Sequence, residues 1–588
     1  MNTLPLQAGN KELLLISLIP EKLNIKTHPI AYFSMEIAVD PAIPTYSGGL
    51  GILAGDTLRA AADLSLSMVG MTLLYRKGYF RQHLDPQGNQ TESAVDWDPG
   101  KLLQPMQPHI TVTVEGRQVQ VQAWRYTLRG VSNHEIQVYF LDTALPENLP
   151  WDQTLTDSLY GGDSHYRLCQ EVVLGLGGFK MLHALGYDDI QDYHMNEGHS
   201  ALLTMALLEE VTEGQGSICA AKSADRESVR KRCVFTTHTP VPAGQDQFPR
   251  DLVRQVLGEE LTTAFEATGC FFNGGLNMTH LALTFSRYIN GVSLRHKQIS
   301  RGMFPGYPID SVTNGVHAAT WTSMPFGRLY DKNIPAWRRD NLYLRYAISI
   351  PLQEIQQAHL EAKQDLLAEV TRRANVQLDP TVMTIGFARR ATLYKRANLL
   401  FSDLDRLKEI AARVGPFQVI FGGKAHPSDG GGKAMIKAVF QAADALRDAV
   451  RVVYLENYDM ELGRYVCAGV DLWLNTPQKP EEASGTSGMK AALNGVPSLS
   501  ILDGWWIEGH VEGVTGWAVG ESWEPESNSA KETASLYDKL EYAILPMFYS
   551  QPNEFTKVRR SAIALNGSFY NAERMAFQYL ENGYISKE

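Results

Sequence analysis

The chain has 588 residues, of which 44% are hydrophobic and 20% charged, and its formal net charge is -11. This composition is ordinary for a folded globular protein and excludes global disorder. The acidic balance also argues against a general nucleic-acid binder, because such proteins usually carry a basic surplus. The length predicts several domains or two large ones.

Two features bear on the cellular location. The five cysteines show no Cys-x-x-Cys spacing, which favours a reducing compartment over a secreted disulfide framework. The longest early apolar run, Leu13 to Ile19, is too short to span a bilayer and lacks the basic start and cleavage site of a signal peptide. We therefore expect a cytoplasmic protein with no membrane partner.

The first half of the chain predicts a mixed α/β domain. In chain order we expect a strand at residues 30–36, a helix at 51–68, antiparallel strands near 110–122 and 135–142, and a short buried strand at 234–237. A helical run at 352–374 and a turn at Asp379-Pro380 follow. We place the domain change here, so residues 1–375 form an N-terminal α/β domain with inserted antiparallel strands.

The second half alternates short apolar strands with amphipathic helices. Strands are expected at residues 381–387, 417–421, 451–455, 472–474 and 496–502, and helices at 394–413, at 432–450, from 459 onward and around 489–493. This alternation predicts a parallel sheet whose strand ends meet at one ligand-binding edge, in a C-terminal parallel α/β domain of residues 376–552. Residues 553–588 are expected to form a C-terminal helix that packs near the domain interface.

A glycine loop, Tyr46-Ser-Gly-Gly-Leu-Gly-Ile-Leu-Ala54, follows the first strand and opens a helix. Glycines let backbone N–H groups approach an anion at a helix N-terminus, where the dipole is positive. The match to a dinucleotide fingerprint is weak, because no strand-end acid follows at the ribose-binding distance. A tight turn without a ligand is the alternative.

Histidines follow two buried strands. His194, Glu197 and His199 lie within six residues, but the spacing is not that of a zinc motif, so we predict a polar cluster and no metal site. His238 follows the strand at 234–237, where a ligand-facing residue belongs. The alternative for His238 is a core histidine whose hydrogen bonds are satisfied.

Four cations, Arg389, Arg390, Lys395 and Arg396, stand at a strand end and at the following helix start. Cations that face a crevice indicate a phosphate ligand, because arginine supplies a planar fork and lysine a point charge. The alternative is a solvated basic face.

The segment Glu481-Glu-Ala-Ser-Gly-Thr-Ser-Gly-Met-Lys490 follows a buried strand and begins a helix. Its small residues expose backbone donors, which favours a second anion site, whereas a glycine-rich helix start without a ligand is the alternative. Lys490 lies in the first turn of the helix. Neighbouring cations lower the pKa of a lysine and free its amine, so Lys490 is a Schiff-base candidate.

Together these motifs resemble the α-glucan (glycogen or maltodextrin) phosphorylases, in particular their compact bacterial branch. The signature is Glu482-Ala-Ser-Gly-Thr-x-x-Met-Lys490 followed by Leu-Asn-Gly495, and matching blocks run from about Ala31 to Asp503 in the family order. The resemblance implies an α/β fold of two Rossmann-like domains of the glycosyltransferase-B type with a cleft between them. It also implies a pyridoxal 5′-phosphate-dependent enzyme that cleaves α-glucan or maltodextrin ends with inorganic phosphate, giving α-glucose 1-phosphate.

The resemblance assigns roles to individual residues. The positions that match catalytic residues are His238, through its main-chain carbonyl, Arg390, Lys395 and Glu482. The positions that match cofactor contacts are Lys490, Thr486, Tyr458, Trp321 and Arg389. The positions that match substrate contacts are Gly48, Gly49, Leu50, Asn314, Ser484 and Gly485. Glu482 is expected to accept a sugar hydroxyl rather than to act as a general acid, since phosphorolysis needs no carboxylate pair.

The chain departs from the family pattern at three places. Thr392 replaces a histidine, Arg389 stands where the family often has lysine, and Ser487-Gly488 replaces Gly-Asn. Lys490 and Arg390 are kept, so these changes alter details of phosphate binding more than the reaction.

Two other functions stay open. A nucleotide-sugar glucosyltransferase of the glycogen-synthase kind shares the fold, a glycine loop and a Gly-Gly-Lys sequence, here Gly422 to Lys424, but the Met-Lys context of Lys490 argues against it. A non-catalytic glucan-binding protein is the second alternative, and the intact Lys490, Arg390 and Asn314 argue against it. Family members usually dimerise, although no segment of the sequence marks an interface.

Overall fold

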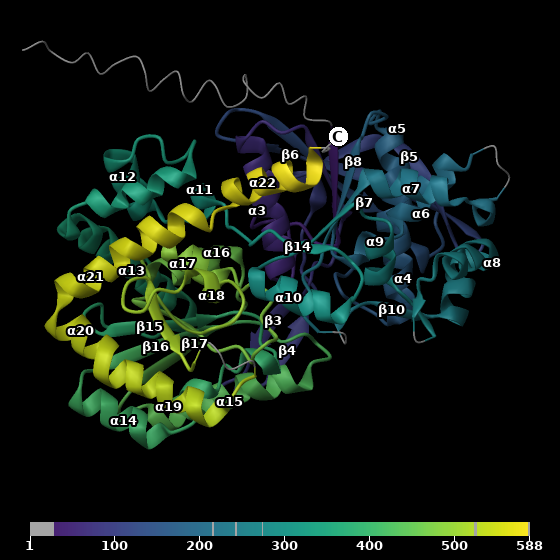
Figure 1. The fold of residues 1–588 in the computed structure, drawn as a ribbon. Coiled ribbons are helices and arrows are strands. Elements are labelled where there is room, and N and C mark those ends of the chain that lie inside the picture. Colours follow the sequence, from purple (N-terminus) through teal and green to yellow (C-terminus); the bar gives the residue numbers. More distant parts are fainter. Residues whose placement is uncertain (1–28, 214–216, 242–243, 273, 522–525, 586–588) are drawn as a thin grey trace, which may run out of the picture.

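Two large sheets organise the chain (Figure 1). The structure is a computed structural model that describes residues 29–213, 217–241, 244–272, 274–521 and 526–585. The first sheet has nine strands in the order β14-β13-β9-β8-β1-β2-β7-β6-β5, and the second has six in the order β17-β16-β15-β18-β19-β20. The predicted fold class, two Rossmann-like α/β parts of the glycosyltransferase-B type, agrees with this architecture.

The first sheet is parallel except at one end. Its strands are β1 (Ile30–Ser34), β2 (Met68–Leu73), β5 (Gln104–Val114), β6 (Arg117–Arg129), β7 (Glu135–Asp142), β8 (Asp192–Asn196), β9 (Cys233–Thr236), β13 (Tyr288–Gly291) and β14 (Ile309–Ser311). Only the β5–β6 and β6–β7 pairs are antiparallel. They are the inserted antiparallel strands that the alternating pattern predicted.

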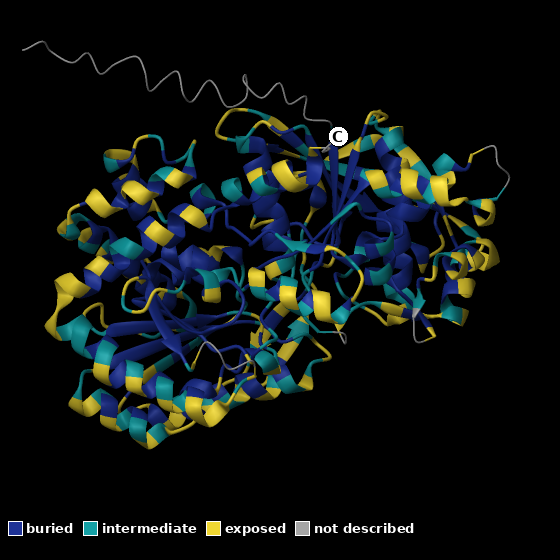
Figure 2. Ribbon diagram, viewed as in Figure 1, coloured by how far each residue is buried: buried dark blue, intermediate teal, exposed yellow. Residues whose placement is uncertain are grey.

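The second sheet is parallel throughout. Its strands are β15 (Met383–Ala388), β16 (Phe417–Gly422), β17 (Arg451–Leu455), β18 (Leu472–Asn475), β19 (Ser498–Ile501) and β20 (Gly516–Val519). Helices cover both faces of such a sheet, which explains why its strands are almost continuously apolar. Figure 2 shows the strands of both sheets buried and the outer helices exposed along one side only.

The helices follow the predicted alternation. Those of the first half are α3 (Gly49–Asp63), α4 (Ser164–Val172), α5 (Gly178–Ala184), α6 (Leu203–Val211), α7 (Ser223–Arg232), α8 (Arg250–Thr268), α9 (Met278–Thr284), α10 (Leu294–Met303), α11 (Ala318–Trp321) and α12 (Met324–Asn333). Those of the second half are α13 (Leu352–Ala374), α14 (Leu404–Arg413), α15 (Gly430–Leu446), α16 (Met460–Gly469), α17 (Ser487–Ala492), α18 (Trp506–Gly509), α19 (Ser529–Lys539), α20 (Leu545–Ser550), α21 (Pro552–Ser561) and α22 (Ala572–Tyr579). No helix among the described residues is both long and apolar enough to cross a membrane.

Three predicted helices have different ends, and one of them, expected at 432–450, spans Gly430–Leu446. The helix expected at 394–413 begins only at Leu404, because Arg396 adopts a left-handed φ of 47° and Asp403 caps the new helix at the backbone N–H of Arg406. The helix expected at 51–68 ends at Asp63, because Ser65 turns the chain with a φ of 56°. Apolar spacing continues through both turns, so the sequence pattern alone does not mark them.

Two segments join the halves of the chain. A hairpin of β3 (Arg81–Leu84) and β4 (Gln90–Ser93) contacts the loop after β16, where Gln82 Nε2 donates to the Gly423 carbonyl at 2.9 Å and Gln90 Nε2 to the Ala425 carbonyl at 2.8 Å. The last helices cross both halves (Figure 1), with α21 in the core of the second sheet and α22 packed on the first. The domain boundaries at residues 375 and 552 stay predictions.

Candidate active site

Residues that follow strands of the two sheets meet in direct contacts. Ser293, which follows β13, donates through its hydroxyl to the Ala483 carbonyl at 2.6 Å. In the other direction, the Glu508 carboxylate accepts from the Thr313 hydroxyl at 2.7 Å and from the Leu294 N–H at 2.9 Å. These contacts join the carboxyl-terminal edges of two parallel sheets, which is where α/β proteins bind ligands.

At this junction Glu482 is held by two of the predicted cations. Lys395 Nζ lies 2.7 Å from both carboxylate oxygens, and Arg389 Nη2 lies 2.7 Å from Oε2. Burial alone raises the pKa of Glu482, but these two cations outweigh it and lower the pKa to about 2. The side chains of Arg389, Lys395 and Glu482 are at most 9% exposed, so a solvated basic face is the wrong interpretation for these two cations.

The other two cations have different surroundings. Arg396 pairs with Glu532 at 2.7 Å and donates to the Pro477 carbonyl at 2.7 Å, so it holds the local fold. Arg390 is exposed and makes no hydrogen bond or ion pair within the described part of the chain; Glu36 and Tyr79 are among its electrostatic neighbours. Of the four cations, Arg390 is therefore the one available to an incoming anion.

The glycine loop opens α3 beside a carboxylate that the sequence analysis missed. Glu36 Oε2 accepts from the N–H of Ser47 at 2.5 Å and of Gly48 at 3.2 Å. A Cβ added at Gly48 or Gly49 would meet no atom within 4 Å, so the space beside these two glycines is open. The position of Glu36 at the end of the predicted strand 30–36 was the signal that could have identified it.

Lys490 lies where α3, α11 and α17 meet. Its Nζ is 3.7 Å from the centroid of the Trp321 ring, and Trp321 Nε1 donates to Asp56 Oδ2 at 2.7 Å. Burial lowers the pKa of Lys490, against the opposing charge of Asp56. A buried amine with a lowered pKa is suited to covalent chemistry with a carbonyl group. Asp56 is a further residue that the sequence analysis missed.

The surroundings of Lys490 fit pyridoxal phosphate. Arg389 Nε and the Ser484 hydroxyl are buried without a hydrogen-bond partner among the described residues. Gly463 lies against Tyr458: a Cβ added at this glycine would be 3.0 Å from the Tyr458 hydroxyl. Thr486 precedes α17, but α17 has only six residues, so its dipole is weaker than the sequence analysis assumed. Arg389 Nε, the ring of Trp321 and the lysine suit an aromatic aldehyde that carries a phosphate, whereas the Ser484 hydroxyl remains for a sugar.

The turn from Glu482 to Gly485 is fixed by its backbone. The Glu482 N–H donates to Asp503 Oδ2 at 3.0 Å, and the Trp505 N–H donates to the Ser484 carbonyl at 3.0 Å. Gly485 has a φ of +85°, which glycine adopts without strain. Burial, with the nearby Glu482, raises the pKa of Asp503 to about 7. The sequence analysis did not identify Asp503.

The clustered histidines separate in the structure. His194 contacts the Tyr584 hydroxyl at 2.6 Å, and His199 contacts Asp246 at 3.2 Å. The described residues contain no group of three or more His, Cys, Asp or Glu that could hold a metal ion.

His238 has a neutral ring that is hydrogen-bonded through Nε2. Its Nε2 lies 2.6 Å from Asn196 Oδ1, its backbone N–H donates to Glu197 Oε2 at 2.7 Å, and burial lowers its pKa to about 3. The ring is therefore neutral, and the main-chain carbonyl remains for the role that the resemblance implies. Glu197 has a φ of 75°, a strained value for this residue type.

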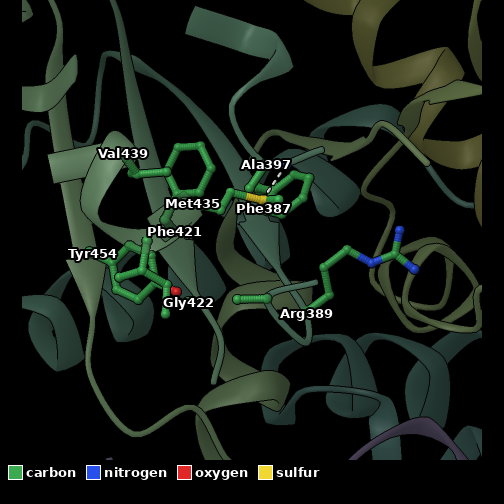
Figure 3. Close-up of a pocket in the computed structure, with 10 residues that line it drawn as sticks. Phe387, Arg389, Ala397, Phe421, Gly422, Met435, Val439 and Tyr454 are labelled. Carbon is green, nitrogen blue, oxygen red and sulfur yellow. Dashed lines mark hydrogen bonds between the residues drawn. The ribbon is translucent and has the colours of Figure 1, made fainter. Parts of the chain in front are cut away.

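A cavity of about 10 Å³ lies behind Arg389. Figure 3 shows its apolar lining, which includes Phe387, Phe421 and Tyr454, with the guanidinium of Arg389 pointing away from it. The cavity holds about one water molecule, so it belongs to the core of the second sheet and not to the site.

Comparisons with known proteins agree with this arrangement. Residues 271–515, which include Arg390, Glu482 and Lys490, match the carbohydrate phosphorylase family model. The chain is 36% identical to the maltodextrin phosphorylase of Thermococcus litoralis, over 95% of this chain and 70% of that protein. It is 35% identical to the glycogen phosphorylase of Mycobacterium tuberculosis, over 94% and 70%, and 33% identical to that of Aquifex aeolicus, over 95% and 86%. The chain therefore belongs to the carbohydrate phosphorylase family.

Proposed function

We propose that this protein is an α-1,4-glucan phosphorylase that uses pyridoxal 5′-phosphate. In this reaction inorganic phosphate cleaves the end of a glucan or maltodextrin and α-glucose 1-phosphate leaves. The observation that carries the proposal is Lys490, a buried amine with a lowered pKa placed over the Trp321 ring. It lies in a sequence signature, Glu482 to Lys490, that also supplies the cation-bound carboxylate of the site.

The residues of the chain divide the work between two phosphates and a sugar. When bound, pyridoxal phosphate supplies a phosphate group that holds or releases a proton near neutral pH. Arg390 and the backbone at the start of α3, Gly49 and Leu50 beside Gly48, bind the inorganic phosphate. Lys395 and Arg389 offset the repulsion between two anions in a site of low dielectric.

The sugar is held by groups that have unused hydrogen-bonding capacity. Three of the roughly four acceptor sites of the Glu482 carboxylate are used by Lys395 and Arg389, and the remaining one suits a sugar hydroxyl. Asn314 Oδ1 and the Ser484 hydroxyl are buried without partners among the described residues. The His238 carbonyl is suited to face the positive charge that develops on the glucosyl carbon.

The nucleotide-sugar alternative is disfavoured by contacts of the Gly-Gly-Lys sequence. The Gly423 carbonyl accepts from Gln82, and Lys424 Nζ donates to the Phe80 carbonyl at 2.9 Å. Both groups therefore hold the β3–β4 hairpin. The glucan-binding alternative is left to the assay below.

We also propose a cytoplasmic location and a homodimer. All five cysteines are free, and four of them are buried, as suits a reducing compartment. The homodimer rests on the family resemblance alone, and analytical ultracentrifugation of the purified protein tests it.

The test of the proposal combines a spectrum with an assay. Purified or reconstituted protein should show a pyridoxal absorbance band, and peptide mapping after borohydride reduction should place the pyridoxyl group on Lys490. Maltodextrin with phosphate should then give glucose 1-phosphate, and Lys490→Ala should lose both the mass label and turnover. No pyridoxal band after reconstitution would refute the cofactor, and bound cofactor without phosphorolysis would leave the glucan-binding protein as the function.

A further inference from the structure

The C-terminal tail, defined here as residues 562–585, packs directly against the loop that carries Asn314. The Val316 N–H donates to the Tyr570 carbonyl at 3.1 Å, and the Ala572 N–H donates to the Val316 carbonyl at 2.9 Å. A Cβ added at Gly315 would lie 2.0 Å from the Asn571 carbonyl oxygen. Only glycine permits this approach, so the tail forms one wall of the Asn314 loop, residues 313–316.

Arg574 on α22 fastens the same loop with its side chain. Its Nη1 donates to the Thr313 carbonyl at 2.6 Å and its Nη2 to the Asn314 carbonyl at 2.9 Å. The guanidinium is itself oriented by the tail, since Nε donates to the Phe569 carbonyl at 2.9 Å and Nη1 also donates to Gln578 Oε1 at 2.8 Å. Burial lowers the pKa of Arg574 to about 10, so it is charged at neutral pH.

The Asn314 side chain is left with an unmade hydrogen bond. Asn314 is 4% exposed, and its Oδ1 has no partner among the described residues. Leaving a buried acceptor unpaired costs about 1–3 kcal/mol, so the fold must hold the loop in place against this cost. The two backbone hydrogen bonds to the tail and the planar fork of Arg574 contribute to this hold, and a fork fixes a direction as well as a distance. The Thr313 hydroxyl bond to Glu508 and the Asn314 N–H bond to the Val292 carbonyl at 3.1 Å hold the other side of the loop.

We propose that Arg574 is a positioning residue for the sugar site. It holds the Thr313 and Asn314 carbonyls so that Asn314 Oδ1 stays free to accept a hydrogen bond from a glucosyl hydroxyl. The tail thereby becomes part of the substrate site although it carries no catalytic group. The identity of the ligand as a glucosyl unit rests on the proposed function, whereas the hold on the loop does not.

Kinetics of three variants test the inference in the holoenzyme. Arg574→Gln should lower kcat/KM for glucose 1-phosphate about 10- to 100-fold, because small misplacements of binding groups have effects of that size. Arg574→Lys keeps the charge without the fork and should recover part of the loss. Arg560→Gln is the matched control. Arg560 lies two residues before the tail and also donates to a backbone carbonyl, that of Ile350 at 3.4 Å, which is not part of the Asn314 loop. This variant should have wild-type kcat/KM.

A double substitution separates positioning from general stability. If Arg574 acts through Asn314, Arg574→Gln should change kcat/KM less than about twofold once Asn314→Ala is present. Effects that multiply would overturn the proposal, as would wild-type kcat/KM in Arg574→Gln.

Hydrogen exchange gives a readout that needs no turnover. The amides of residues 314–316 should exchange at least about tenfold faster in Arg574→Gln than in wild type or Arg560→Gln, because the loop opens locally. Unchanged exchange would refute the hold on the loop. If wild type forms no glucose 1-phosphate while exchange increases as expected, the proposed function fails and the hold on the loop stands.

Discussion

Glu482 in the second half of the site is satisfied differently from Glu36 and Glu197 in the first half. On the edge of the second sheet, Glu482 is balanced by two side-chain cations, Lys395 and Arg389. On the edge of the first sheet, Glu36 and Glu197 are balanced mainly by backbone N–H groups. In the first arrangement an incoming anion can share the two cations with the Glu482 carboxylate. In the second arrangement the carboxylates fix the backbone of the loops. We therefore infer that the second half supplies the side-chain cations that bind phosphate groups, and that the first half adds backbone N–H groups and fixes the loops around them.

Removing the carboxylate from the second half should have the largest effect. Glu482→Ala leaves Lys395 and Arg389 buried without a counter-charge, and breaking a buried pair in this way costs about 3–5 kcal/mol. We expect a markedly lower Tm in calorimetry and loss of most phosphorolysis. Inorganic phosphate should raise the Tm of Glu482→Ala more than that of wild type, since an anion that binds only the folded state stabilises it. If phosphate raised the Tm of wild type and of Glu482→Ala equally, Lys395 and Arg389 would not form an anion site in the second half.

Removing a carboxylate charge from the first half should cost less and should not respond to phosphate. Glu197 accepts from the backbone N–H of His238 and Gly198 and from the Thr239 hydroxyl. Glu197→Gln loses charge-assisted hydrogen bonds, for a cost of about 2 kcal/mol. The measurement is Tm with and without phosphate, beside kcat on maltodextrin. A rescue by phosphate would show that Glu197 faces an anion site after all.

A further effect concerns the pH dependence of stability. The pKa of Asp503 is raised to about 7, against about 4 in an unfolded chain. Between these values the folded state holds a proton that the unfolded chain has lost, so the contribution of this group to stability is complete below pH 4 and declines as the pH rises to 7. In Asp503→Asn, Tm should fall less steeply over this range than in wild type. If the Tm of Asp503→Asn and of wild type changed in parallel between pH 4 and pH 7, the raised pKa of Asp503 would be contradicted.

The sequence predicted regular elements well where one pattern decides them. The strand at 451–455 and the helix at 352–374 have the predicted ends, because continuous apolar runs and helical spacing change sharply at their boundaries. The helix at 394–413 was wrong over its first ten residues. There the left-handed turn at Arg396 and the cap at Asp403 interrupt a spacing that remains helical.

The sequence predicted the types of side chain at the site better than their partners. Lys490 and Glu482 were identified through a local sequence signature. The cation cluster at residues 389–396 was identified too, but its sequence does not distinguish Arg390, which is exposed, from Arg396, which is paired with Glu532. Arg574 lies about 260 residues from the loop it holds. Such a contact depends on how the chain returns across the first sheet, and no local pattern records it.

The dependence of turnover on phosphate tests the central claim most directly. Glucose 1-phosphate and free glucose released from maltoheptaose would be measured as phosphate is increased, for wild type and for Arg390→Gln samples of equal pyridoxal absorbance. We predict saturable release of glucose 1-phosphate without free glucose, and a phosphate KM at least about tenfold higher in Arg390→Gln, since a charged fork to phosphate is lost. Release of free glucose without phosphate, or an unchanged phosphate KM in Arg390→Gln, would contradict it.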